Sequence, residues 1–186
     1  MNLAEDYLEI AVDAARDKHD SLNEILDRLP VAIYLTDAQG TITHFNRACI
    51  ELAGRVPVLR HDKWCVTWKL YTLGGAPLPH DQCPMAIAIR EQRSVRGEQA
   101  IAERPDGTRV YFVPYPTPLF DDDGALVGAV NLLVDVTQTR HAQYLREQAK
   151  RCRRLAAAIS DMRTISTLKG MAEEYEGQAA QLLMPN

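Results

Sequence analysis

Two pairs of histidine and cysteine lie within one stretch of the chain and have side chains that can ligate a metal. His61 precedes Cys65 by four residues, and His80 precedes Cys83 by three. Zinc accepts thiolate sulfur and imidazole nitrogen, usually four ligands in a tetrahedral arrangement. The spacings His-x-x-x-Cys and His-x-x-Cys are not those of a zinc finger, however. We therefore expect four unrelated polar or buried side chains and no metal site.

Other residue types with chemical potential are isolated along the chain. The three consecutive carboxylates at 121–123 do not fit a calcium-binding loop and are typical of a solvated hairpin tip. The sequence contains no evident nucleophile–base pair, phosphate-binding loop or pair of catalytic carboxylates. We therefore expect that the protein is not an enzyme.

Composition and charge narrow the class of protein further. The 186 residues carry a formal net charge of −4, which provides no general attraction to nucleic acid. The basic cluster at 150–154 accompanies no helix-turn-helix signature and is interpreted as the solvated side of a helix. No apolar run reaches the roughly 20 residues that span a membrane, and the acidic N-terminus does not resemble a signal peptide. We expect a cytoplasmic protein with its 4 cysteines reduced, no membrane association and no nucleic-acid partner.

The first 29 residues predict one amphipathic helix. Apolar residues repeat at spacings of three, four or seven, as on the seam of a coiled coil. These positions are Leu8, Ala11, Ala15, Leu22, Ile25 and Leu29. Pro30 ends the helix, because a proline pushes the residue before it out of the helical conformation. We expect this helix to serve in dimerisation, although the pattern leaves open whether it packs on its own sheet, on a partner chain or on both.

The middle of the chain, residues 30–137, alternates strand and turn patterns. The expected strands are 31–37, 41–46, 95–103, 109–119 and 125–136. The expected helices are 47–53, which Asn46 caps and Gly54 ends, and 84–90. Two strands, then helices, then three strands predict an α+β fold.

Residues 138–186 predict a helical hairpin. Each arm carries one apolar stripe at alternating spacings of three and four residues. A break around Ser160 and Asp161 separates the two arms. Gly170 and Gly177 weaken the second arm by roughly 1 kcal/mol each relative to alanine, so we expect that arm to depend on packing.

The segment from about Leu22 to Thr137 resembles a PAS domain. The resemblance rests on residues that occur in the family's order and spacing. They are Leu29-Pro30-x-Ala32-Ile33, Thr36-Asp37-Ala38-Gln39-Gly40-x-Ile42, Asn46-x-Ala48, Leu52-x-Gly54, Arg104-Pro105-Asp106-Gly107-Thr108, Asp123-Gly124-x-Leu126-Val127-Gly128 and Asp135-Val136-Thr137. The resemblance implies a five-stranded antiparallel sheet with short helices on one face at 30–137. The N-terminal helix at 1–29 and the C-terminal helical hairpin at 138–186 then flank this sheet.

The resemblance also implies a sensory or protein-interaction role. Domains of this family often hold a ligand between the sheet and the helices, and their flanking helices dimerise and transmit a signal. We expect a stand-alone signalling module that acts as a homodimer and contacts a protein partner in a signalling pathway. For a small-molecule ligand, the expected pocket residues are Ile33, Leu35, Phe45, Leu52, Trp64, Met85, Ile89, Phe112 and Leu132.

Two alternatives remain open, because members of the family also bind cofactors or only dimerise. The first is a haem- or metal-binding sensor that uses the region of His80 and Cys83, since both residue types hold haem iron. The competing interpretation of this region is that His80 and Asp81 cap the helix that follows. The second alternative is a structural dimerisation module with a core filled by its own side chains. The cysteines do not match the reactive motif of flavin-binding light sensors, and the sequence does not identify a cofactor.

Overall fold

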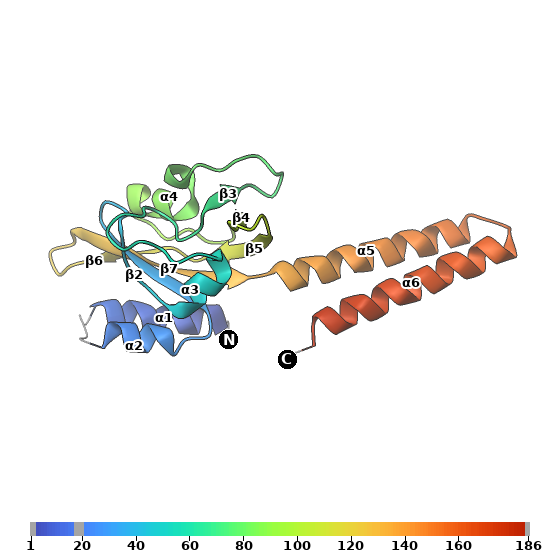
Figure 1. The fold of residues 1–186 in the computed structure, drawn as a ribbon, viewed down its shortest axis with the longest axis horizontal. Helices are drawn as coiled ribbons and strands as arrows, with labels where there is room; N and C mark the ends of the chain where they lie inside the picture. Colours follow the sequence, from blue (N-terminus) through green and yellow to red (C-terminus); the bar gives the residue numbers. More distant parts are fainter. Residues whose placement is uncertain (1–2, 17–20, 185–186) are drawn as a thin grey trace. The chain divides into compact units, whose positions relative to one another are not determined.

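The structure is a computed structural model that describes residues 3–16 and 21–184. Its internal contacts divide the chain into two units, one that ends at Asp135 and one that begins at Val136 (Figure 1). The first unit carries a β-sheet, and the second carries two long helices.

Strands of the first unit pair only in antiparallel fashion within the described residues. The order across the sheet is β2-β1-β7-β5-β4-β3, and β6 also pairs with β7. The strands are β1 Ala32–Asp37, β2 Ile42–Phe45, β3 Lys69–Tyr71, β4 Ala100–Glu103, β5 Arg109–Pro114, β6 Thr117–Phe120 and β7 Leu126–Asp135. The first hairpin therefore lies beside the last strand, and the expected α+β class with an antiparallel sheet is confirmed.

The described residues form 7 strand segments, where the sequence predicts five. The strand expected at 109–119 is broken at Tyr115 and Pro116 into β5 and β6, because proline has no N–H to donate to a ladder. β3 forms within the stretch expected to be irregular, and it pairs with β4. The additional segments thus subdivide and extend the predicted sheet without changing its topology.

The N-terminal segment forms two helices, where the sequence predicts one. α1 spans Leu3–Arg16 and α2 spans Leu22–Asp27, while residues 17–20 lie outside the described residues. Both helices pack against one face of the sheet, opposite α4 (Pro84–Glu91), as Figure 1 shows. We call this layer the outer core. Its buried side chains are Leu8, Ala11, Ala14, Leu22, Leu26, Ile33, Leu35, Leu119, Val130 and Leu132.

The other face of the sheet is covered by α3 (Arg47–Ala53), α4 and the long loop between them. We call this layer the inner core. Its largest fully buried side chains are Tyr34, Ile42, Val66, Met85, Phe112 and Leu133. Because both faces of the central strands are covered, β1 is buried along almost its whole length.

α3 begins and ends where the sequence predicts. The Asn46 side chain accepts a hydrogen bond from the Cys49 N–H, as an N-cap does. Gly54 follows the helix with φ at 64°, a left-handed conformation that glycine adopts without strain.

α4 begins at Pro84 as expected, but His80 and Asp81 do not cap it. These two residues lie in a 3-10 turn, η1 (His80–Gln82). Cys83 occupies the position before α4 and makes no side-chain capping bond. The capping interpretation of His80 and Asp81 is therefore wrong.

The second unit is the expected helical hairpin, formed by α5 (Thr137–Ala157) and α6 (Met162–Leu182). In the turn, the Asp161 carboxylate accepts a hydrogen bond from the Thr164 N–H at 2.8 Å and caps α6. The two helices meet largely through alanines spaced by seven residues. They are Ala142, Ala149 and Ala156 on α5 and Ala172 and Ala179 on α6. Among the helices in the described ranges, none combines the length and apolar character that a bilayer span requires.

Candidate functional site

A chain of buried hydrogen bonds crosses the inner core and is centred on Tyr34. This side chain extends from β1 and is 0% exposed. Its hydroxyl donates to the Trp64 backbone carbonyl at 2.8 Å and accepts from Asn131 Nδ2 at 2.9 Å. Asn131 Oδ1 accepts in turn from the Tyr115 N–H at 3.0 Å. The chain therefore connects β1, β7 and the break between β5 and β6 to the long loop over the sheet.

The same environment fixes the protonation of the groups near Tyr34. Burial raises the pKa of the Tyr34 hydroxyl well above its usual range, and the adjacent thiols of Cys65 and Cys83 raise it further. Burial also raises the pKa of Cys65, and it raises the pKa of Cys83 to about 12. At neutral pH all three groups are protonated, and protonated thiols are poor nucleophiles and poor metal ligands.

Trp64 joins the inner core to the turn between β1 and β2. Its backbone is left-handed, with φ at 68°, which is rare for a large side chain. The Trp64 N–H donates to the Gly40 carbonyl at 2.7 Å. The ring lies against Gly40, where an added Cβ would come within 2.2 Å of it. Such backbone strain persists only where its surroundings hold it, as Tyr34 and Gly40 do at this position.

A second buried polar group, the side chain of Asn46, joins the N-terminal helices to the sheet. Asn46 is 1% exposed. Its Oδ1 accepts from the N–H groups of Ile33 at 3.0 Å and Cys49 at 3.2 Å. Its Nδ2 donates to the carbonyls of Leu26 at 3.0 Å and Val31 at 2.8 Å. One side chain thus forms hydrogen bonds with α2, with α3, with β1 and with Val31, the residue before β1. A displacement of α2 from the sheet therefore breaks at least the hydrogen bond to Leu26.

The structure brings six of the nine predicted pocket residues together and places three elsewhere. The six lie in or against the inner core. They are Phe45, Leu52, Trp64, Met85, Ile89 and Phe112. The other three lie in the outer core, across the sheet. They are Ile33, Leu35 and Leu132. Successive side chains of a strand point to opposite faces, so neighbours in β1 and β7 belong to different layers.

A β-bulge in the first hairpin brings Phe45 to the inner core. Tyr34 is paired with Phe45 and Thr36 with Ile42, with a register shift between the two pairs. The extra residue on β2 lets Ile42 and Phe45 contact the same core, although simple alternation would place them on opposite faces. The bulge therefore decides which residues of this strand face the inner core.

The four candidate metal ligands lie in different surroundings. Cys65 and Cys83 are buried in the inner core, where the Cys65 thiol accepts a hydrogen bond from Thr67 Oγ1 at 3.2 Å. His61 is exposed beside Asp62. In the described part of the chain, no group of three or more histidine, cysteine, aspartate or glutamate side chains is arranged to hold a metal ion.

His80 is the candidate with the most unusual environment. Its Nε2 is buried and has no hydrogen-bond partner among the described residues. Burial lowers the pKa of His80 and the Arg55 cation lowers it further, while Asp62 and Asp81 oppose this effect. The charges beside it come from a half-buried ion pair of Arg55 with Asp62. The haem- or metal-binding alternative therefore has one neutral imidazole but no assembled set of ligands.

A comparison of the sequence with models of known families identifies the family. A family model described as PAS domain matches residues 30–138. The chain belongs to the PAS domain family. PAS domains form a family of sensory and signalling modules, so the expected family and the class of function that it implies are confirmed.

Solved structures with similarity to the chain are PAS and light-oxygen-voltage domains. A PAS domain from Colwellia psychrerythraea is 22% identical, with a TM-score of 0.43, over 62% of this chain and 93% of that one. The PAS domain of the fruit-fly ELK potassium channel is 17% identical, with a TM-score of 0.46, over 68% of this chain and 97% of that one. The LOV protein of Rhodobacter sphaeroides is 10% identical, with a TM-score of 0.43, over 91% and 95%. No curated protein matches the chain.

Sequence reasoning missed both buried polar groups. It interpreted Asn46 as a helix cap only, and it assigned no role to Tyr34 or Asn131. The available signal was a polar residue inside an apolar strand run, as at Tyr34 in 31–35 and Asn131 in 129–134. Buried polar side chains need partners, so each such residue predicts a hydrogen-bond network, but not its other members.

Proposed function

We propose that the chain is a PAS signalling module that acts as a homodimer and through contact with another protein. The inner core is the sensing element in this proposal, and the flanking helices are the output. The observation that carries the proposal is the fully buried Asn46, whose side chain bonds α2 to β1 and α3. A change in the packing of β1 is transmitted to α2 through these bonds.

The inner core supplies a second link in the same direction. Tyr34 lies one residue after Ile33, and the Ile33 N–H donates to Asn46. The Tyr34 hydroxyl donates to the carbonyl of Trp64 in the long loop. A ligand that displaced Trp64 would break this bond and change the packing of β1. The six inner-core candidates, with Trp64 among them, are the residues proposed to contact such a ligand.

We propose a binding role in place of catalysis, in a reducing compartment such as the cytoplasm. The raised pKa values of the inner-core thiols support the first part, because protonated thiols are weak nucleophiles. The free state of Cys49, Cys65, Cys83 and Cys152 supports the second.

Hydrogen exchange of the backbone amides tests the transmission from the core to α2. The change is Tyr34→Phe, which removes the hydroxyl and leaves the ring in place. We expect faster exchange in the loop around Trp64 and also in α2, measured by mass spectrometry of peptic peptides. Tyr144→Phe is the matched control, because Tyr144 is 58% exposed on α5 and its hydroxyl contributes little to the core. Unchanged exchange in α2 beside a faster loop would contradict the proposed transmission.

Native mass spectrometry of the purified chain tests the other parts of the proposal. We expect the mass of a dimer, and any retained small molecule adds its own mass to that of the protein. A monomer throughout the micromolar range would contradict the homodimer. A bound haem or metal would favour the cofactor alternative at His80 over a core without a cofactor.

A further inference from the structure

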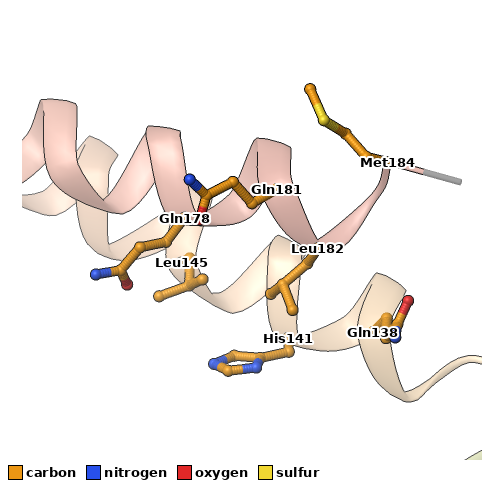
Figure 2. A pocket seen from close by; sticks show the side chains of 7 residues that line it. All are labelled: Gln138, His141, Leu145, Gln178, Gln181, Leu182 and Met184. Carbon is orange, nitrogen blue, oxygen red and sulfur yellow. The ribbon is translucent and has the colours of Figure 1, made fainter. Parts of the chain in front are cut away.

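One face of the C-terminal hairpin carries no aspartate, glutamate, lysine or arginine. On α5 it consists of the residues spaced by multiples of seven from His141 and Leu145. They are Gln138, His141, Leu145, Gln148, Cys152 and Leu155. On α6 it consists of the residues spaced by multiples of seven from Gln178 and Leu182. They are Thr164, Leu168, Met171, Tyr175, Gln178 and Leu182. The side chains of His141, Leu145, Gln178 and Leu182 line one depression between the helices, so the two stripes share a side of the hairpin (Figure 2). We call this surface the uncharged face.

The opposite side of the hairpin differs sharply in charge. Arg153 on α5 pairs with both carboxylate oxygens of Glu176 on α6, one of them at 2.7 Å. Lys169 and Glu173 line a second depression on this side together with Arg153. Charged residues are thus collected on one side of the hairpin and are missing from the other.

The uncharged face exposes large apolar side chains. Leu155 on α5 is 46% exposed, and Met171 on α6 is 40% exposed. Leu168, Tyr175 and Leu182 are only half-buried beside them. The buried interior between the two helices consists of alanines, one cysteine and one leucine, Leu145, so it buries little apolar area. Two helices of this kind bury too little surface to be stable without another element.

A second copy of the same face suits this surface better than a charged partner does. In a two-fold dimer the same patch meets itself, so a patch with an excess of charge of one sign would repel its copy. The uncharged face contains no such charge, and its polar members, such as Gln148 and Gln178, carry amides that both donate and accept hydrogen bonds. A partner that binds by charge would instead contact the other side of the hairpin.

The size of the uncharged face is sufficient for a dimer. Each helix has 21 residues. At 1.5 Å per residue such a helix is about 31 Å long, and two adjacent helices are about 20 Å wide. The footprint is therefore about 600 Å² per copy, or about 1,200 Å² in total, which reaches the lower limit for stable interfaces.

We infer that the uncharged face is the homodimer interface, on which the same face of a second copy packs to form a four-helix bundle. The inference rests on the proposed function for the existence of a homodimer, and it assigns the surface. It also moves the interface away from the N-terminal seam, whose Leu8 and Leu22 are buried in the chain's own outer core.

The test adds like charges to the uncharged face and measures the dimer dissociation constant by sedimentation velocity. The variant is Gln148→Arg with Gln178→Arg in the full chain, because arginine and glutamine have similar helix propensities. We expect the dissociation constant to rise about a hundredfold, since the contacting faces of both copies then carry two positive charges each and repel one another. The matched control is Gln143→Arg, on the exposed side of α5 away from this face, with a change of less than about twofold.

Each result of this experiment has a defined meaning. A dimer that the double variant does not weaken overturns the surface assignment and leaves the homodimer intact. A wild-type monomer throughout the micromolar range overturns both, whereas the exchange experiment on α2 still tests signal transmission on its own. Equal weakening by Gln143→Arg also overturns the assignment. Circular dichroism of the double variant verifies that its helices are formed, and Leu155→Glu provides an independent change on the same face that must act in the same direction.

Discussion

Removal of the Asn46 side chain should destabilise the first unit more than any comparable change at its surface. In Asn46→Ala the N–H groups of Ile33 and Cys49 and the carbonyls of Leu26 and Val31 each lose one hydrogen bond. At about 1 kcal/mol net for each bond, the free energy of unfolding falls by about 4 kcal/mol. Domains have about 5–15 kcal/mol in total, so the variant remains folded but loses a large share of its stability.

Denaturant unfolding followed by tryptophan fluorescence measures this loss. The chain has 2 tryptophans, Trp64 and Trp68, and both belong to the first unit, so the signal reports that unit. For a unit of this size we expect the melting temperature to fall by roughly 12–16 °C. The matched control is Asn23→Ala on the exposed side of α2, with an expected change within about 0.5 kcal/mol.

The size of the loss decides whether Asn46 holds α2 in place. A loss below about 1 kcal/mol with an unchanged denaturant slope would refute the reasoning, because water would then have replaced the bonds. Asn46→Asp provides a second measurement. A carboxylate at this position faces the carbonyls of Leu26 and Val31, so its pKa in the folded state is raised. The folded state then binds a proton more tightly than the unfolded state does, and this variant should gain stability as the pH falls toward 4.

Three further predictions follow from backbone geometry and from one histidine. Gly177→Ala should stabilise α6 by up to about 1 kcal/mol, since an added methyl group meets nothing within 4 Å, and helix melting by circular dichroism measures the gain. Gly128→Ala should lower the free energy of unfolding several times as much as Gly74→Ala, as measured by denaturant unfolding. The added methyl group at Gly128 would lie 2.1 Å from the Thr36 carbonyl oxygen, whereas at Gly74 the nearest atom is 3.8 Å away. Equal losses would contradict the close approach of β1 and β7. Because the pKa of His80 is lowered in the folded state, the unfolded state binds a proton first as the pH falls, and stability decreases below about pH 6.5. In His80→Gln this decrease should be smaller. An identical pH profile of stability in the variant would show that another group is responsible.

The sequence predicts the elements of this protein better than their layers. Caps and breaks are local signals, so Asn46, Gly54, Pro84 and Asp161 mark helix ends that the structure confirms. The broken N-terminal helix is a different case. The apolar spacing of 1–29 fits one helix as well as two, and only packing on the sheet distinguishes these arrangements.

The candidate site was only partly predictable, because both faces of the central strands are covered. Alternation reveals the buried face of a strand only when the other face is polar. In β1, Ile33 and Tyr34 are both 0% exposed, yet they lie in different layers. The bulge near Thr43 adds a second ambiguity, since it depends on pairing with β1. The partners of Tyr34 are distant in sequence, so no local pattern identifies them.

The outer core has a consequence for how much of the chain must be kept together. The family match covers residues 30–138, but α1 and α2 precede it. A fragment cut to the matched range would uncover apolar side chains of the sheet, Ile33, Leu35 and Leu132 among them. Such a contiguous patch on a β-sheet is a site of aggregation. The fragment that expresses well should therefore begin at or before Leu3, because the unit that folds is larger than the unit that the family defines.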